Sequence, residues 1–177
     1  MDNRITDLLG KCCAGKDTMA KHMKLQFKYN FVISTTTRPM RNGESEGNPY
    51  HFISNEEFED GIWNGKFIEY MGYKRDDSVW YYGVSKDEIE DYKSYVAVLD
   101  IIGLREFRKA FGNRVFATYL DVPESERLER CKRRGDYNEE EWIRRKESDD
   151  LMFTNDVIEE IGDIQLLTNN NFINKNE

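Results

Sequence analysis

Apolar residues near the N-terminus gather in short runs that are separated by a helix-like segment. Residues 4–10 and 31–34 have the pattern of short strands, and residues 16–28 between them have the pattern of a helix. Residues 95–100 form a continuous apolar run that ends in an acid, which is typical of a buried parallel strand. Asp7 is awkward in this scheme, because it falls inside the first strand. The order of strand, glycine loop, helix and strand predicts the opening of an α/β fold with a parallel sheet.

The middle of the chain has a different character. Residues 35–92 are polar, turn-rich and aromatic, with strand-like pieces at 50–53, 67–71 and 80–83 and a helix-like stretch at 55–63. This segment is interpreted as a lobe inserted into the core. Beyond it the alternation of helix and strand returns. The expected elements are a helix at 103–111, a strand at 114–122, a helix at 123–134 that begins at a proline, and a last strand at 163–168, with a charged stretch at 134–148 and a frayed tail at 169–177.

Composition narrows the class of protein. The chain has 177 residues, of which 38% are hydrophobic and 13% aromatic, so it can form one compact core and is not globally disordered. A net charge of -8 argues against a broad nucleic-acid-binding surface. Three cysteines, two of them adjacent, do not form a disulfide framework or a zinc motif. Neither a signal peptide nor an 18-residue apolar run is visible, which predicts a reduced, cytoplasmic protein without a membrane partner.

Residues 10–18 read GKCCAGKDT and match most of the phosphate-binding loop pattern G-x-x-x-x-G-K-[ST]. Gly10, Gly15 and Lys16 fit the pattern, whereas Asp17 stands where a hydroxyl is expected and Thr18 comes one place late. Glycines allow backbone N–H groups to converge on phosphate oxygens, and the start of a helix adds partial positive charge. The position between a strand and a helix favours a phosphate site over an incidental glycine turn.

A second group of candidate anion ligands lies at the start of the inserted lobe. Arg38 and Arg41 are three positions apart, and Tyr50 follows nine positions later. Two guanidiniums and a phenol can converge on one phosphate, because arginine presents a planar fork of donors. Two solvated loop arginines are the alternative that these residues leave open.

The stretch around these arginines resembles the guanylate kinase signature T-T-R-x-x-R-x-G-E-x-x-G-x-x-Y-x-F. The matching positions are Thr36, Thr37, Arg38, Arg41, Gly43, Glu44, Gly47, Tyr50 and Phe52. The similarity continues through GKFIEY, YYG, VLDI and RRGDYNEEEWIRR, from Gly10 to about Arg145, with a weaker match near residue 168. So many fixed positions at matching spacing exclude a chance likeness.

The resemblance implies a fold and a reaction. The fold is an α/β, P-loop NTPase-type three-layer fold with a parallel central sheet, an inserted lobe that binds a nucleoside monophosphate, and a lid. The whole chain, 1–177, would be a single domain, with a core at about 1–34, 93–126 and 150–177, the lobe at about 35–92 and the lid at about 127–149. The implied reaction is transfer of the γ-phosphoryl group of ATP, with Mg²⁺, to GMP or dGMP.

The resemblance also assigns the acceptor residues. Glu69 would read the base, because guanine presents two N–H donors on one edge and a carboxylate accepts both, a pair that adenine cannot offer. The full acceptor set implied is Ser34, Arg38, Arg41, Tyr50, Glu69 and Tyr82.

The donor side follows in the same way. Phosphoryl transfer needs positioning and positive charge, which arginines on a mobile lid supply, although a salt-bridged charged helix is the alternative reading. The implied catalytic residues are Lys16, Arg41, Arg134 and Arg145. The implied ATP-binding residues are Gly10, Cys13, Ala14, Gly15, Lys16, Asp17, Thr18, Arg130 and Arg134, and the implied metal ligands are Asp17 and Asp100.

Several positions depart from the family pattern. Val84 stands where a serine or threonine helps to read the base, and Ile102 falls where a second acid is expected. About four extra residues, among them RDDS, lie between Glu69 and Tyr82, and the closing helix after the last strand is missing from the pattern. Two alternatives therefore stay open: a kinase of this fold for another nucleoside monophosphate, and a non-catalytic protein-binding module. Asp17 could help to hold magnesium, or it could obstruct the loop and merely cap the helix.

Overall fold

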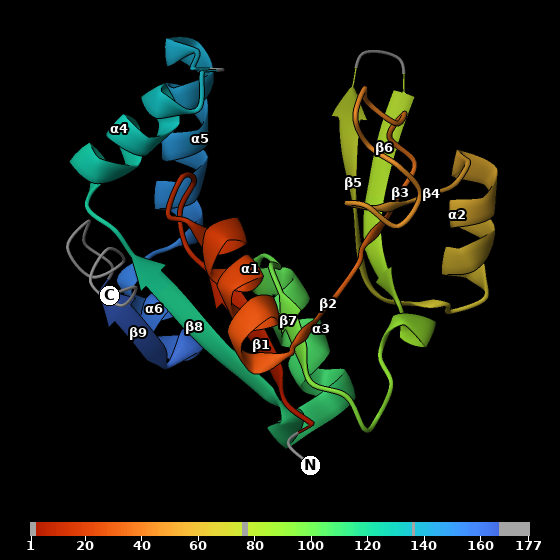
Figure 1. Ribbon diagram of the computed structural model, residues 1–177. Coiled ribbons are helices and arrows are strands. Elements are labelled where there is room, and N and C mark those ends of the chain that lie inside the picture. Colours follow the sequence, from red (N-terminus) through yellow and green to blue (C-terminus); the bar gives the residue numbers. More distant parts are fainter. Residues whose placement is uncertain (1–2, 76–77, 136, 167–177) are drawn as a thin grey trace.

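The computed structural model of the chain describes residues 3–75, 78–135 and 137–166, arranged around a parallel sheet (Figure 1). Within these residues the sheet has five strands in the order β2-β7-β1-β8-β9, and every neighbouring pair is parallel. The strands are β1 (Ile5–Leu9), β2 (Asn30–Phe31), β7 (Tyr95–Ala97), β8 (Val115–Asp121) and β9 (Asp163–Leu166). Because the strands are parallel, their carboxyl ends and the loops that follow meet at one edge.

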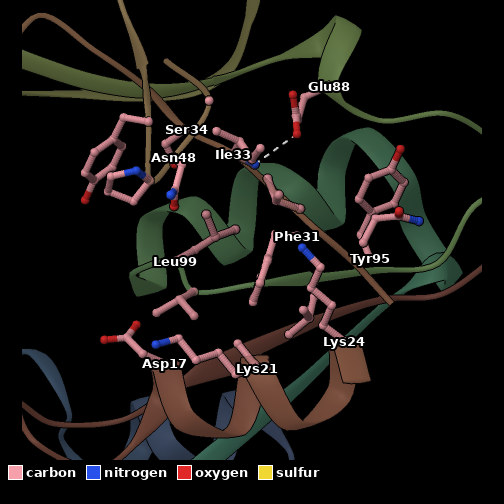
Figure 2. Close-up of a pocket in the computed structure, with 18 of the residues that line it drawn as sticks. Asp17, Lys21, Lys24, Phe31, Ile33, Ser34, Asn48, Glu88, Tyr95 and Leu99 are labelled. Atoms are coloured by element: carbon pink, nitrogen blue, oxygen red, sulfur yellow. Dashed lines mark hydrogen bonds between the residues drawn. The ribbon is translucent and has the colours of Figure 1, made fainter. Parts of the chain in front are cut away.

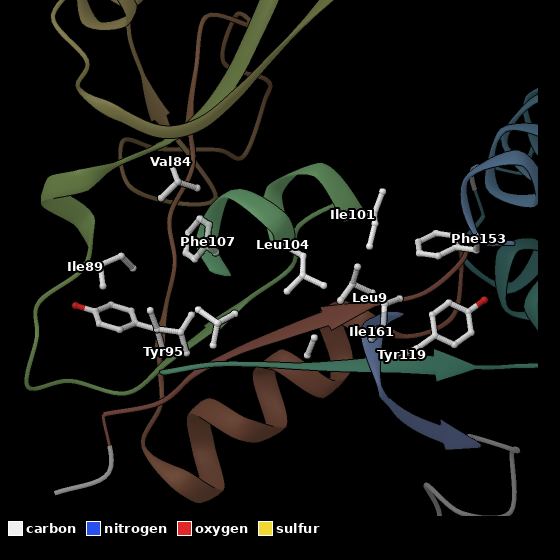
Figure 3. Close-up of a cluster of buried hydrophobic side chains, with 13 residues drawn as sticks. Leu9, Val84, Ile89, Tyr95, Ile101, Leu104, Phe107, Tyr119, Phe153 and Ile161 are labelled. Atoms are coloured by element: carbon white, nitrogen blue, oxygen red, sulfur yellow. The ribbon is translucent and has the colours of Figure 1, made fainter. Parts of the chain in front are cut away.

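Helices cover both faces of this sheet. Leu8 of β1 packs with Ala20 of α1 (Lys16–Phe27), whereas Ile5 and Leu9 on the opposite face belong to the larger cluster shown in Figure 3. This cluster joins the sheet to α3 (Ile101–Phe111) and α6 (Asn155–Ile161). The alternation along β1 therefore produces three layers, as expected for the P-loop NTPase-type fold. Helices α4 (Glu124–Arg133) and α5 (Glu139–Met152) stand beside the phosphate-loop end of α1 (Figure 1).

A second sheet forms a separate lobe on the other side of α1 and α3 (Figure 1). In the described part of the chain its order is β4-β3-β6-β5, with β3 (Thr35–Thr36), β4 (His51–Phe52), β5 (Phe67–Arg75) and β6 (Ser78–Ser85). Phe58 of α2 (Asn55–Trp63) is fully buried and stacks on Phe67 at 4.2 Å and on Tyr81 at 5.2 Å. A Cβ at Gly83 would lie 2.7 Å from the Glu69 carbonyl oxygen, so this position requires glycine. Short 3₁₀ turns lie at Lys86–Glu88 and Gly112–Arg114.

The sequence pattern predicted most of these elements but not all their limits. The expected strand at 31–34 is shorter, because the Ile33 N–H donates to Glu88 and the chain turns toward the lobe. The expected strand at 95–100 stops at Ala97, and Asp100 instead caps α3 by accepting from the Gly103 N–H at 2.8 Å. Helix α5 was foreseen only as the alternative of a salt-bridged charged helix and α6 was not predicted, and each begins at a polar cap. Residues 76–77 of RDDS, the tail at 169–177 and the end of the last strand lie outside the described residues.

Asp7 is fully buried in the middle of β1. One carboxylate oxygen accepts from the Leu99 N–H at 2.9 Å, while the other, among the described residues, has no hydrogen-bond partner. Burial is the main cause that raises the pKa of Asp7 from 3.8 to about 7. An acid is accommodated in this strand because it is neutral at mildly acidic pH and satisfies the N–H group where β7 ends.

We expect Asp7→Asn to remove a pH dependence of stability. The folded state holds the Asp7 proton more tightly than the unfolded state, so stability is lost as the pH rises from about 4 through 7. This group alone should lower the free energy of unfolding by roughly 2–3 kcal/mol between pH 5 and pH 8. Urea unfolding of both proteins at the two pH values measures the difference. If the two proteins lose the same stability over that range, the interpretation of Asp7 is wrong.

Candidate active site

The phosphate loop joins β1 to α1 and has the backbone geometry that its glycines allow. Gly10 and Gly15 have φ values of +146° and +97°, and Cys13 also lies in the left-handed region at +59°. A Cβ at Gly10 would lie 2.9 Å from the Leu120 carbonyl oxygen, so β8 packs directly against the loop. Lys16 folds back over the loop and donates to the Gly10 carbonyl oxygen at 2.6 Å. Burial lowers the pKa of Lys16.

The two residues after Lys16 begin α1. Asp17 and Thr18 are both exposed on its first turn. Gly15 takes the N-cap position without a side-chain cap, so Asp17 is not the capping residue of this helix. The Asp17 carboxylate raises the pKa of Lys16, although less than burial lowers it, and it is one of the charges that raise the pKa of Tyr50 in the lobe. The Asp17 charge therefore influences both the loop lysine and the lobe.

The three predicted lid arginines differ in their contacts and in their distance from the phosphate loop. Arg130 of α4 donates to the Ala14 carbonyl oxygen of the loop at 2.9 Å. Arg134 is exposed at the C-cap of α4, and its N–H donates to the Cys131 carbonyl oxygen at 3.2 Å. Arg145 of α5 pairs with Glu141 on the same helix, at 2.6 Å from Nε to Oε1. The structure thus brings Arg130 to the loop, while Arg145 takes part in a surface ion pair.

Arg38 is the best-held residue of the predicted acceptor set. Its guanidinium is 4% exposed and forms a bidentate pair with Glu44 at 2.9 and 2.8 Å. Glu44 also accepts from the Arg41 N–H at 2.7 Å, which orders the turn that carries the exposed Arg41 side chain. Hydrogen bonding to Glu44 raises the pKa of Arg38, and the guanidinium lies over the Tyr50 ring at 5.3 Å. Glu44 thus fixes the orientation of the arginine fork.

Three tyrosines of the lobe line up beside this arginine. The rings of Tyr50 and Tyr82 meet edge to face at 5.7 Å, and Tyr73 meets Tyr82 in the same way at 5.7 Å. Burial raises the pKa of Tyr50 and of Tyr73, so both phenols stay protonated at neutral pH and can donate hydrogen bonds. Tyr50 and Tyr82 were predicted from the motif, whereas Tyr73 was not.

Glu69 lies on β5 opposite Val84 of β6. Burial raises the pKa of Glu69 from 4.5 to about 7, and the Asp100 carboxylate adds to the rise. Asp7 contributes in the same direction. Three carboxyl groups from β1, β5 and the start of α3 therefore influence one another where the lobe meets the core, and an incoming hydrogen-bond donor would stabilise the ionised form of Glu69.

A pocket of about 1150 Å³ lies between α1 and the lobe. Asp17 and Lys21 of α1 extend toward it from below, and Ser34 and Asn48 approach from the lobe side (Figure 2). Glu44 and Tyr50 also line it. Of the predicted site residues, Asp17, Ser34 and Tyr50 line this pocket, whereas Lys16, Arg38, Arg41, Glu69 and Tyr82 are not among its lining residues.

Comparison with known proteins decides the family. The guanylate kinase family model matches residues 3–174. The chain belongs to the guanylate kinase family. It is 33% identical over 145 residues to the guanylate kinase of Aster yellows witches'-broom phytoplasma, an alignment that covers 78% of this chain and 67% of that protein. It is 30% identical over 175 residues to the guanylate kinase of Chlorobium luteolum, covering 90% of this chain and 87% of that protein.

A solved structure has the same fold. The guanylate kinase of Anaplasma phagocytophilum superimposes with a TM-score of 0.62 at 22% identity, covering 94% of this chain and 78% of the other. The expected fold and the expected enzyme class, a nucleoside monophosphate kinase of guanylate kinase type that phosphorylates GMP, are confirmed. No helix among the described residues is long and apolar enough to cross a membrane.

Two positions that depart from the guanylate kinase pattern have distinct environments. Val84 is fully buried in the main core cluster shown in Figure 3. Ile102 on the first turn of α3 is 45% exposed. Val84 therefore contributes to packing beneath Glu69, and a polar residue there would need a partner inside the core.

The acidic residues of the predicted metal site could bind Mg²⁺ only together with the phosphates of a nucleotide. No group of three or more histidine, cysteine or acidic residues that could hold a metal occurs in the described ranges. Asp17 and Asp100 are hard oxygen donors, and Mg²⁺ in kinases is commonly held by one or two carboxylates together with substrate phosphates and water. The residues present therefore fit a metal that arrives with its nucleotide.

Two residues that hold the phosphate loop in place were not predicted from the sequence. Arg127 of α4 is 3% exposed, donates to the carbonyl oxygens of Val122 and Cys12 at 3.2 and 3.4 Å, and lies over the Trp142 ring at 5.5 Å. Asp149 of α5 accepts from the Cys12 N–H at 2.6 Å. Both sit in charged helical stretches where acids and bases alternate, so nothing in the local pattern distinguishes them from solvated surface residues.

Proposed function

We propose that this chain transfers the γ-phosphoryl group of ATP to GMP or dGMP by direct in-line displacement. The observation that carries the proposal is the intact loop geometry, in which the Lys16 ammonium is held 2.6 Å from the Gly10 carbonyl oxygen. A module that only binds protein has no need of a partly buried lysine folded over a phosphate loop. The pocket shared by Asp17, Ser34 and Tyr50 supports an acceptor site next to this loop.

On the donor side, Gly10, Cys13, Ala14 and Gly15 shape the loop whose N–H groups receive the ATP phosphates. Lys16 neutralises the β- and γ-phosphates. Arg130, Arg134, Lys16, Asp17 and Thr18 complete the proposed ATP site. We assign residues 127–149 as the lid, so that Arg134 and Arg145 reach the transferring group when it closes and water is excluded.

On the acceptor side, Arg38, Arg41, Tyr50 and Tyr82 hold the phosphate of GMP. Glu44 orients the Arg38 fork, and Tyr50, whose ring meets that of Tyr82 edge to face, lies beside it. Ser34 and Glu69 recognise the guanine edge, with Glu69 as the acceptor of both N–H groups. We assign residues 35–92 as the lobe that carries these groups toward the core.

Phosphoryl transfer requires that the two nucleotides are correctly placed and that positive charge surrounds the transferring group. Lys16, Arg41, Arg134 and Arg145 surround the transferring phosphoryl group with positive charge, and no side chain forms a covalent intermediate. Magnesium bound with ATP supplies further charge neutralisation on the phosphate oxygens. Asp17 and Asp100 are the residues that would hold that ion, and its charge would offset the repulsion between Asp17 and phosphate.

One assay tests this proposal. ADP release coupled to a reporter reaction is measured with GMP, dGMP, AMP, CMP, UMP and dTMP as acceptors, with and without Mg²⁺. GMP or dGMP should give the highest kcat/KM, and omission of Mg²⁺ should abolish turnover. A higher kcat/KM with another nucleotide would support the alternative favoured by Val84 and Ile102, a kinase of this fold with a different acceptor. No turnover with any acceptor would support the non-catalytic module.

Arginines of the lobe and of the lid should differ in kinetics. Arg41→Ala should raise the KM for GMP by about tenfold, because it removes one charge from the bound acceptor. Arg145→Ala should mainly lower kcat, by about a hundredfold, because its contact strengthens in the transition state. Arg144→Ala is the matched control, since Arg144 also pairs with Glu141. Equal and small effects of Arg144→Ala and Arg145→Ala would mean that α5 is only a salt-bridged surface helix.

A further inference from the structure

The N–H group of Cys12, in the middle of the phosphate loop, already has an anionic partner. The Asp149 carboxylate of α5 accepts from it at 2.6 Å, although the two residues are 137 positions apart in the sequence. Burial and a hydrogen bond to Asp149 raise the pKa of the Cys12 thiol to about 12, so the thiol stays protonated beside this acid. A side chain of α5 therefore touches the loop as a bound anion would.

The same carboxylate acts on the loop lysine. Burial lowers the pKa of Lys16, and Asp149 is the charge that opposes this effect most strongly, ahead of Asp17. Lys16 itself donates to the carbonyl oxygens of Gly10 and Lys11 at 2.6 and 3.2 Å. Asp149 thus faces two groups, a loop N–H and the loop cation, that are suited to a polyphosphate.

The next acid on α5 makes a different contact. Asp150 forms an ion pair with Lys11, and both side chains are partly exposed, at 43% and 23%. Asp149 and Asp150 thus bind the neighbouring loop residues Cys12 and Lys11. Among the described contacts, Asp149 binds a backbone N–H group and Asp150 binds a side chain. Because Asp150 carries the same charge on the same helix, it offers a matched comparison.

We propose that Asp149 is a positioning residue that holds the nucleotide-free phosphate loop against α5, and that the polyphosphate of the donor displaces its carboxylate. The Asp149 carboxylate already accepts the Cys12 N–H at 2.6 Å, and it would repel a phosphate that approached the same N–H group. Donor binding therefore breaks the contact and releases α5, which carries Arg145. This step couples occupancy of the loop to movement of the helix, and it rests on the proposed use of a triphosphate donor.

The test is equilibrium binding by calorimetry, with MgATP and with pyrophosphate as probes. Asp149→Asn keeps an oxygen that can accept the Cys12 N–H but removes the negative charge. It should bind both probes about fivefold more tightly than the wild type. Asp150→Asn changes the net charge equally and should alter either affinity by less than about twofold. The thermal stability of the ligand-free Asp149→Asn protein should stay close to that of the wild type.

Two results would overturn the proposal. Weaker binding by Asp149→Asn would make Asp149 part of the donor site, and equal effects of the Asp149 and Asp150 variants would reduce the contact to general electrostatics. Asp149→Ser serves the same comparison if the asparagine variant does not fold. If the wild type binds pyrophosphate but not MgATP, the proposed donor is wrong. The affinity of Asp149→Asn for pyrophosphate, relative to that of the wild type, still decides the role of Asp149.

Discussion

Lys16→Ala should lower kcat/KM for GMP phosphorylation by about a thousandfold, the largest effect of any single substitution in this chain. The Lys16 ammonium is held over the loop by the Gly10 carbonyl oxygen at 2.6 Å, and partial burial lowers the pKa of Lys16. In such an environment its charge acts on the phosphates with little screening. Most of the loss should appear in kcat, because charge on the transferring group is stabilised more in the transition state than in the bound substrate.

The control for this variant is Lys109→Ala. Lys109 is 71% exposed and pairs with Glu106 on α3, so its loss removes the same charge at a distance from the loop. Circular dichroism and the unfolding midpoint should show that both variants are folded. A Lys16→Ala protein that is folded and retains more than about a tenth of the wild-type kcat/KM would contradict the assignment of the loop.

Glu69→Gln should abolish the preference for guanine. The carboxylate can accept both N–H groups of the guanine edge, whereas the amide of glutamine presents its own donors to one of them. An unmatched buried pair costs about 1–3 kcal/mol, so the KM for GMP should rise by about 5- to 150-fold while the KM for AMP changes little. Glu56→Gln, at an exposed position on α2 of the same lobe, should leave both values unchanged.

The pH dependence gives a second test of Glu69. Burial raises its pKa to about 7 in the free protein, so the carboxylate is increasingly protonated below that pH. Protonation removes an acceptor from the base site, and the KM for GMP should therefore rise as the pH falls from 8 to 6. Glu69→Gln has no such proton, so the ratio of its KM to that of the wild type should shrink at low pH. A constant ratio would show that Glu69 does not bind the base.

Local patterns were sufficient for much of the fold and for the family. The phosphate loop, α1, α2, β8 and the aromatic lobe are all encoded in short stretches, because turn glycines, capping residues and apolar periodicity act between neighbours in the chain. The arginine signature was equally local: Arg38 and Glu44, which form the bidentate pair, are six residues apart. Charged segments were harder to assign. Helix α5 was foreseen only as the alternative of a salt-bridged helix and α6 was not predicted, because apolar periodicity is weak in both.

The sequence by itself thus determined the class of fold, the phosphate loop and the acceptor motif, and the tertiary structure decided which charges act on them. Asp7 was visible as an anomaly, but only the packing of β1 shows that it is fully buried and neutral at mildly acidic pH. Asp149 and Arg127 looked like surface charges until the fold placed them against Cys12, more than a hundred positions away. The physical reason is that desolvation and long-range hydrogen bonds depend on which distant segments meet, and a local pattern carries no record of that.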